Sequence, residues 1–133
     1  MKVNGSCHCG KITFEAEIDP DRIGICHCTD CQTLSGSAFR ITAPAGEADF
    51  KLLTGTPKLY IKTAESGAKR VQAFCGECGT ALYATSVGGE NRIFGIRVGT
   101  IRQRRELTPK RQFWCSSKLP WLPALPGVEF ENQ

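Results

Sequence analysis

The stretch Cys75-Gly76-Glu77-Cys78 carries two cysteines on one short turn, and Gly79 follows it directly. A two-residue gap of this kind lets both sulfurs reach one metal ion at about 2.3 Å, and glycine beside the turn relieves its backbone strain. Two further clusters have similar spacing, Cys7-His8-Cys9 and Cys26-His27-Cys28-Thr29-Asp30-Cys31. Of the eight cysteines in the chain, seven therefore lie in three close clusters, and Cys115 stands apart.

Seven thiolates divide most simply into a group of four and a group of three. The group of four joins the first and last clusters: Cys7, Cys9, Cys75 and Cys78. Four cysteines around zinc make a closed tetrahedral site, which is typical of a structural ion. The group of three is the middle cluster: Cys26, Cys28 and Cys31. Three protein ligands leave one position for water or substrate, as in a catalytic zinc, so we expect two Zn²⁺ per chain.

The spacing leaves other arrangements open. Both sites could be structural, with Cys115 or a histidine as the eighth ligand, and the clusters could pair differently. Disulfides are a further possibility, although they rarely persist in a cytosolic protein. His8 and His27 each lie between two cysteines, so we expect their side chains to point away from the metal. His27 is the better placed of the two for proton transfer near an open zinc.

The composition indicates a soluble globular protein that forms a single domain over residues 1–133. The chain is 41% hydrophobic and 23% charged, which is ordinary for such proteins. No apolar run approaches the roughly 20 residues of a membrane helix, and Met1–Gly5 contains no apolar signal core. We therefore expect a cytoplasmic protein with no membrane partner. The net charge of +4 moves toward zero once seven thiolates bind two Zn²⁺, so we do not expect a nucleic-acid partner.

Short alternating segments predict a mainly β chain. Residues 11–18 alternate apolar and polar side chains, which is typical of a half-buried strand. Seven more strands are expected at Ala38–Thr42, Phe50–Leu53, Lys58–Thr63, Arg70–Phe74, Thr80–Ala84, Arg92–Val98 and Gln112–Cys115. Turn-forming residues lie between these segments, which predicts a sheet sandwich or a partly open barrel.

Helix is expected at one place only. Thr29 or Asp30 can cap a short turn that Gly36 stops. The segment Leu119–Pro126 contains three prolines, which exclude a helix or a central strand. We expect the apolar side chains of this segment, Trp121 among them, to pack across the sheets.

Taken together, the motifs resemble the glutathione-dependent formaldehyde-activating enzyme family, which shares its domain with centromere protein V. The resemblance rests on five segments in the same order: Gly5–Gly10, Cys26–Phe39, Phe50–Gly55, Phe74–Thr80 and Ser116–Trp121. It covers nearly the whole chain, and three coupled cysteine motifs make it specific.

The resemblance implies a β-tent, in which antiparallel sheets surround a structural zinc and helix is scarce. It also implies structural zinc at the group of four, catalytic zinc at the group of three, and the family's reaction. That reaction joins formaldehyde to glutathione and gives S-hydroxymethylglutathione, a carbon–sulfur lyase reaction in reverse. Two departures bear on the substrate: Gln112 stands where family members commonly have histidine, and Cys115 stands where an apolar residue is usual.

The sequence therefore predicts a zinc-dependent carbon–sulfur lyase whose partner is a small thiol such as glutathione. His27 or Asp30 is the candidate for moving the proton. The basic segment Arg97–Lys118 could pair with substrate carboxylates or face solvent, and Ser35–Ser37 could donate hydrogen bonds. One alternative is a non-catalytic, zinc-stabilised module that binds protein or nucleic acid. Another is a redox enzyme, because Phe113–Ser117 is similar to the catalytic cysteine segment of methionine-R-sulfoxide reductases.

Overall fold

The computed structural model describes residues 1–64, 66–125 and 127–131. These residues form eleven strands: β1 (Lys2–Ser6), β2 (Thr13–Glu17), β3 (Gly24–Cys26), β4 (Arg40–Gly46), β5 (Phe50–Thr54), β6 (Lys58–Thr63), β7 (Lys69–Phe74), β8 (Ala81–Ser86), β9 (Ile93–Arg97), β10 (Arg111–Phe113) and β11 (Glu129–Glu131). The helices are α1 (Thr29–Ser35) and five 3₁₀ turns: η1 (Pro20–Arg22), η2 (Glu47–Asp49), η3 (Val98–Thr100), η4 (Arg104–Glu106) and η5 (Cys115–Ser117). None of the helices in these residues is long and apolar enough to cross a membrane. The expectation of a mainly β chain with little helix is confirmed.

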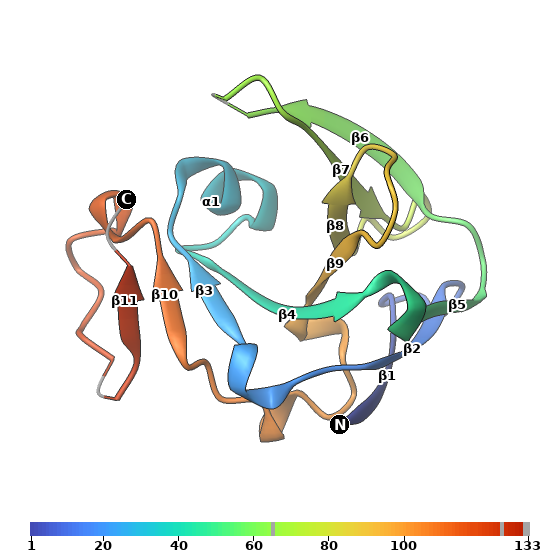
Figure 1. The fold of residues 1–133 in the computed structure, drawn as a ribbon, viewed down its shortest axis with the longest axis horizontal. Coiled ribbons are helices and arrows are strands. Elements are labelled where there is room, and N and C mark those ends of the chain that lie inside the picture. Colours follow the sequence, from blue (N-terminus) through green and yellow to red (C-terminus); the bar gives the residue numbers. More distant parts are fainter. Residues whose placement is uncertain (65, 126, 132–133) are drawn as a thin grey trace.

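The strands form two sheets (Figure 1). The small sheet is antiparallel and has the order β1-β2-β5, and the large sheet has the order β11-β10-β3-β4-β9-β8-β7-β6. In the large sheet β10 runs parallel to both β3 and β11, whereas the other paired strands are antiparallel. The antiparallel architecture that the resemblance implies thus becomes mixed at one edge. A parallel neighbour needs a long crossover, and the chain between β3 and β10 supplies it.

The sequence did not predict β11, and it did not predict two strands that carry no alternating pattern, β1 and β3. β1 contains Asn4 and Gly5 and is held by its pairing with β2, which runs in register from Lys2↔Glu17 to Ser6↔Thr13. β3 has three residues and lies between β4 and β10. Both strands form because a neighbour pairs with them, which a local pattern does not reveal.

The strand β4 is longer than expected and runs through Pro44. The sequence predicts a strand at Ala38–Thr42, but the structure extends it to Gly46. β3 pairs with Arg40–Thr42 only, so β9 is the single neighbour at Pro44. A proline without a donor is tolerated there, because that side of the strand has no partner to receive a hydrogen bond.

The apolar core lies between the small sheet and one face of the large sheet. The alternation of β2 buries Phe14, and β5 contributes Phe50 at a ring-centroid distance of 5.6 Å from it. Phe50 also stacks on Phe94 of β9 at 5.0 Å and meets Tyr83 of β8 edge-on at 5.1 Å. This aromatic cluster joins the two sheets, and the opposite face of the large sheet is left for α1 and the polar side chains.

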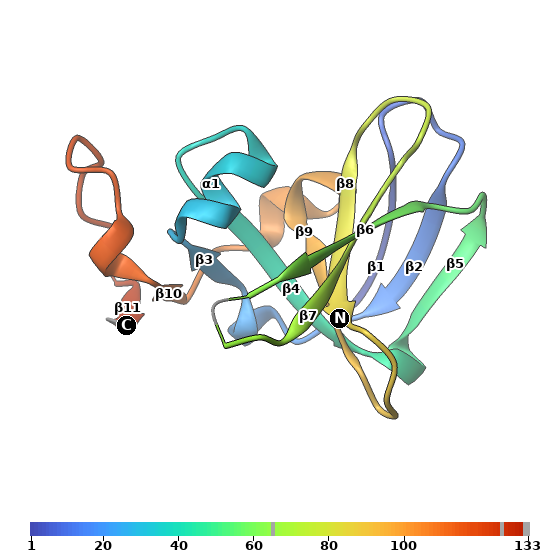
Figure 2. The ribbon, with the colours of Figure 1, turned by 90° about the horizontal axis from the view of Figure 1, so that it is seen from above.

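The segment before β11 loops away from the sheets (Figure 2). Its residues 119–125 form no helix or strand, as the prolines predict, and Pro126 lies outside the described residues. The expected packing of Trp121 is wrong, because 70% of its surface is exposed. The loop projects from the sheets because β11, which follows it, pairs with β10 at the edge of the large sheet. This pairing extends the sheet and does not cover its face.

Candidate metal centres

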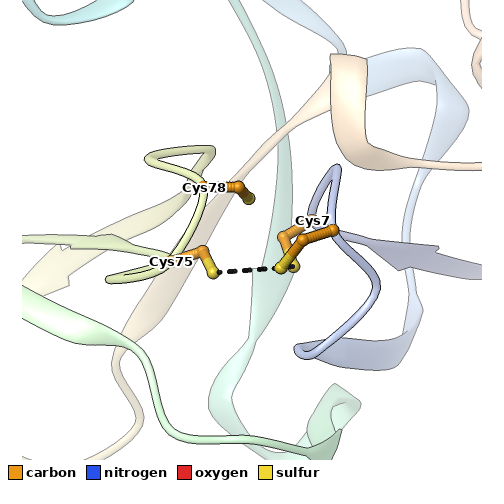
Figure 3. Close-up of side chains that lie close together, drawn as sticks. Cys7, Cys75 and Cys78 are labelled. Atoms are coloured by element: carbon orange, nitrogen blue, oxygen red, sulfur yellow. Dashed lines mark hydrogen bonds between the residues drawn. The ribbon is translucent and has the colours of Figure 1, made fainter.

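The four cysteines of the first and last clusters meet at one point, as the sequence predicts. Cys7 and Cys9 follow β1, Cys75 and Cys78 follow β7, and the two loops face each other (Figure 3). The Sγ atoms of Cys7 and Cys9 are 3.6 Å apart, and those of Cys9 and Cys75 are 3.7 Å apart. A tetrahedron with metal–sulfur bonds of about 2.3 Å requires sulfur separations of about 3.8 Å. The group therefore has the dimensions of a four-thiolate metal site.

Backbone hydrogen bonds shape each of these loops. The Cys75 N–H donates to the Thr80 carbonyl at 2.9 Å, and the Gly79 N–H donates to the Cys75 carbonyl at 2.8 Å. Gly79 has φ +80°, in the left-handed region that favours glycine. In the other loop, the Ile12 N–H donates to the Cys7 Sγ at 3.3 Å. These donors point at sulfur and carbonyl atoms, so each turn is folded around its cysteines.

The electrostatics of the four-cysteine group favour a bound cation. Hydrogen bonds from the Thr80 hydroxyl and backbone lower the pKa of Cys78 to about 5. A hydrogen bond from the Lys11 backbone N–H lowers the pKa of Cys9, but burial and the neighbouring sulfurs raise it to about 11. Four sulfurs this close repel one another as thiolates, and a divalent ion removes that repulsion.

The three cysteines of the middle cluster also converge. Cys26 ends β3, Cys28 is the N-cap of α1, and Cys31 lies in the first turn of that helix. Their Sγ atoms lie within 4.8 Å of one another, and the Cys28 Sγ accepts a hydrogen bond from the Cys31 N–H at 3.3 Å. The helix ends at Gly36, which has φ +67°. The predicted stop at Gly36 is confirmed, but Cys28 caps the helix in place of the predicted Thr29 or Asp30. This cap brings the three sulfurs together.

Among the described residues no fourth His, Cys, Asp or Glu joins this group of three. Cys115 is half-buried at the start of η5 and belongs to neither group. His8 is exposed. The alternative in which Cys115 or a histidine completes the second site is therefore not supported.

Two arginines contribute positive charge beside the group of three. A hydrogen bond from Cys26, with the charges of Arg40 and Arg97, lowers the pKa of Cys31 to about 5 against the effect of burial. The pKa of Cys26 is raised, chiefly because of the neighbouring Cys31 sulfur. Burial lowers the pKa of Arg97 to about 9, and repulsion from Arg40 acts in the same direction. At least one thiolate is therefore favoured before any metal binds.

His27 lies behind the group of three in the protein interior. It is 1% exposed, its Nε2 lies 2.9 Å from the Gln112 Oε1, and its ring meets Phe39 edge-on at 5.6 Å. Because an amide oxygen only accepts, Nε2 carries the proton in this pair. The Nδ1 atom is buried and has no hydrogen-bond partner among the described residues. The contact explains what Gln112 does in this chain, namely to hold the His27 ring.

The other sequence-predicted site residues lie farther out. Asp30 is 56% exposed and pairs with the Lys62 Nζ at 2.8 Å, which ties α1 to β6. The Ser35 hydroxyl donates to carbonyls of its own loop at 3.4 and 3.5 Å. In the basic segment, Arg97 lines a cavity beside α1, whereas η4 carries its arginines on the surface.

A cavity of about 300 Å³ lies between α1 and the polar face of the large sheet. Leu34 of α1 lines it, together with Arg40, Arg97, Gln72 and Tyr60. The sequence reasoning missed Arg40, because its only signal is its register opposite Cys26. A larger hollow of about 560 Å³ lies against β1 and β2. No cysteine among the described residues lines either of these two cavities, whereas Cys26 lines a third one of about 220 Å³.

The chain is similar to a recognised family and to two curated proteins. A family model described as glutathione-dependent formaldehyde-activating enzyme matches residues 2–117. An uncharacterized lyase of Schizosaccharomyces pombe is 29% identical over 90 residues, which are 68% of this chain and 62% of that protein. A Halomonas elongata protein, named provisionally as a glutathione-dependent formaldehyde-activating enzyme, is 29% identical over 87 residues. Those residues are 62% of this chain and 55% of that protein, so the chain matches less than two thirds of either relative.

A solved structure supports the fold. The crystal structure of a Rhodobacter sphaeroides protein superposes with a TM-score of 0.59 and covers 96% of this chain and 99% of its own. Sequence identity between the two chains is 19%, so the similarity concerns the fold alone.

Proposed function

The chain belongs to the glutathione-dependent formaldehyde-activating enzyme family, and we propose that it is a metal-dependent carbon–sulfur lyase acting on a thiol adduct. The reaction would join glutathione and formaldehyde into S-hydroxymethylglutathione, or use a related thiol and aldehyde. The observation that carries the proposal is the group Cys26, Cys28 and Cys31, in which three sulfurs converge without a fourth ligand among the described residues.

The two cysteine groups suit zinc. Thiolates are ligands that zinc prefers, and both groups have sulfur separations that one ion can span. We propose a structural Zn²⁺ at the group of four and a catalytic Zn²⁺ at the group of three. Zinc held by three protein ligands keeps one position for an outside thiol and lowers the pKa of that thiol.

The chain's own residues would hold the reactants and carry the proton. A bond forms between the thiol sulfur and the aldehyde carbon, and the thiol proton ends on the aldehyde oxygen. We propose His27 as the proton carrier, since its Nδ1 has no other partner among the described residues and Gln112 orients the ring. Asp30 is the weaker candidate, because its carboxylate is exposed and paired with Lys62.

We propose that the protein acts in the cytoplasm. All eight cysteines are free thiols in the structure, and seven of them belong to metal-binding groups. A reducing compartment keeps such thiols available for metal, whereas an oxidising one would link them as disulfides.

The proposal is tested by nuclear magnetic resonance of formaldehyde exchange with glutathione at increasing concentrations of zinc-loaded protein. We expect the exchange rate to rise in proportion to the protein. We expect His27→Asn to lower that rate by about 10²–10⁴-fold, the usual contribution of a proton-transfer group, while both metals stay bound. An exchange rate that stays at its uncatalysed value would exclude this substrate pair. A protein that binds two metal ions but neither binds nor converts thiols and aldehydes would instead be a zinc-stabilised binding module.

A further inference from the structure

Strand register places a set of polar side chains on the face of the large sheet that carries α1. Residues paired directly across antiparallel strands point to the same face, and alternate residues of one strand share a face. One face can be followed across five successive strand pairings, from β3 to β6. The residue pairs on it are Cys26↔Arg40, Thr42↔Arg97, Gly95↔Ala84, Ala84↔Gln72 and Gln72↔Tyr60. The metal-group residue Cys26 therefore shares its face with two arginines, a glutamine and a tyrosine that line the 300 Å³ cavity.

The two arginines of this face have no acidic partner. Arg40 is 8% exposed, and no ion pair of the described residues includes Arg40 or Arg97. On the strands β3, β4 and β6–β9, no position of this face is Asp or Glu. Buried guanidinium groups are normally paired with carboxylates, so the charge of these two arginines would be balanced by a bound anion that is not part of this face.

Neutral groups hold Arg97 in place but do not balance its charge. Its Nη2 donates to the Gln72 Oε1 at 2.9 Å, and its Nη1 donates to the Thr42 Oγ1 and the Gly95 carbonyl, both at 3.3 Å. Its Nε is buried and has no partner among the described residues. The guanidinium is thus fixed in orientation at the cavity, and these neutral partners leave its charge unbalanced.

The charge of the metal group does not remove this excess. Three thiolates and one divalent ion carry a single negative charge, whereas the two arginines carry two positive charges. Lys62 and Arg70 lie opposite each other on the same face, and Asp30 neutralises Lys62 at 2.8 Å whereas Arg70 adds a further positive charge near Arg97. An excess of positive charge therefore remains on this face, and a carboxylate would reduce it.

We propose that this cavity binds a carboxylate of the thiol substrate through Arg40 and Arg97, so that the protein selects carboxylate-bearing thiols over neutral ones. The inference rests on the proposed function for the identity of the substrate as a thiol. Arginine pairs carboxylates through two parallel hydrogen bonds, which fixes the orientation of the bound molecule as well as its affinity. The cavity volume is at the lower end of the range for small-molecule sites, which fits one arm of a small peptide-like thiol.

The test is isothermal titration calorimetry of the zinc-loaded protein with glutathione and with glutathione diethyl ester. The ester keeps the thiol and the amine but has no carboxylate. We expect wild-type protein to bind glutathione at least tenfold more tightly than the ester. Arg40→Gln and Arg97→Gln should each weaken glutathione binding by about 10- to 100-fold, as expected for a lost charge-assisted pair, and should leave ester binding nearly unchanged. The control Arg105→Gln, an exposed arginine of η4, should change neither.

Two results would overturn the inference. One is equal affinity of the wild-type protein for glutathione and for the ester. The other is an equal loss of both ligands, or loss of the second metal, in the arginine variants, because the arginines would then serve only to balance the metal group. If Arg40→Gln fails to fold, the wild-type comparison and Arg97→Gln decide the question. No aldehyde is present in this titration, so a protein that discriminates the two thiols but does not speed formaldehyde exchange supports the inference and excludes only the proposed reaction.

Discussion

The substitutions Cys28→Ser and Cys75→Ser make the same chemical change in the two metal groups and should have opposite outcomes. Cys28 is the N-cap of α1, and its Sγ accepts the Cys31 N–H at 3.3 Å. Serine is among the preferred N-cap residues, so Cys28→Ser keeps the cap while it removes one of three metal ligands. Cys75 is 1% exposed and lies in the group that joins the β1–β2 loop to the β7–β8 loop.

The magnitudes follow from what each site holds together. A structural zinc contributes about 10–16 kcal/mol of apparent binding free energy in small zinc domains, whereas whole domains are stable by about 5–15 kcal/mol. Cys75→Ser should therefore unfold the chain or lower its melting temperature by tens of degrees. For Cys28→Ser the cap is kept, and loss of an ion whose free concentration is about 100 times its Kd removes about 2.7 kcal/mol. We expect its melting temperature to fall by roughly 10 °C, well short of the loss expected for Cys75→Ser.

The assay is thermal denaturation by circular dichroism, combined with metal analysis of the dialysed proteins by mass spectrometry. Wild-type protein should hold two zinc ions per chain, and folded Cys28→Ser should hold one. The matched control is Cys115→Ser, which changes a cysteine outside both groups and should keep two ions. Equal destabilisation by Cys28→Ser and Cys75→Ser would refute the assignment of different roles to the two groups, as would a Cys75→Ser protein that stays folded with two ions.

Three other predictions concern packing, pH and metal removal. A Cβ on Gly5 would lie 2.3 Å from the Thr100 carbonyl oxygen, so Gly5→Ala should lower the free energy of unfolding, measured in urea, by about 1–3 kcal/mol or more. The control Gly99→Ala places its Cβ in open space and should leave that free energy unchanged. Equal effects of the two substitutions would contradict this prediction. Hydrogen bonds from Arg92 lower the pKa of Glu47, so the pair stabilises the fold at pH values above the ordinary carboxyl pKa, and this stabilisation is lost as the pH falls through the lowered pKa. The melting temperature of the wild-type protein should therefore exceed that of Glu47→Gln at pH 7, and the difference should shrink in acid. A difference that widens in acid would contradict the prediction. A zinc chelator should remove one ion with unchanged circular dichroism and the second only with unfolding; release of both ions together would show that the two sites are equivalent.

Local chemistry explains which features the sequence could predict. The end of α1 was predicted from Gly36, which follows the helix directly, and the start was placed one or two residues late because Cys28 rather than Thr29 or Asp30 is the cap. The strand β6 has the predicted bounds Lys58–Thr63, because its neighbours Thr56-Pro57 and Ala64 mark a clear break in the pattern. The strands β1 and β3 escaped prediction because they have no alternating pattern and form by pairing, β1 with the adjacent β2, and β3 with β4 and the distant β10. Trp121 was misjudged because composition does not tell whether an apolar side chain finds a surface to cover.

The sequence by itself predicted the two cysteine groups of four and three that could hold metal, because chelation depends on spacings of two or three residues within each cluster, and the structure brings both groups together. Only the tertiary structure decided what surrounds the group of three. The register of the large sheet brings Arg40 and Arg97 to the face that carries Cys26, and the packing of β10 against β3 sets Gln112 on His27. Those neighbours come from distant parts of the chain, and their positions depend on the pairing of every strand between them.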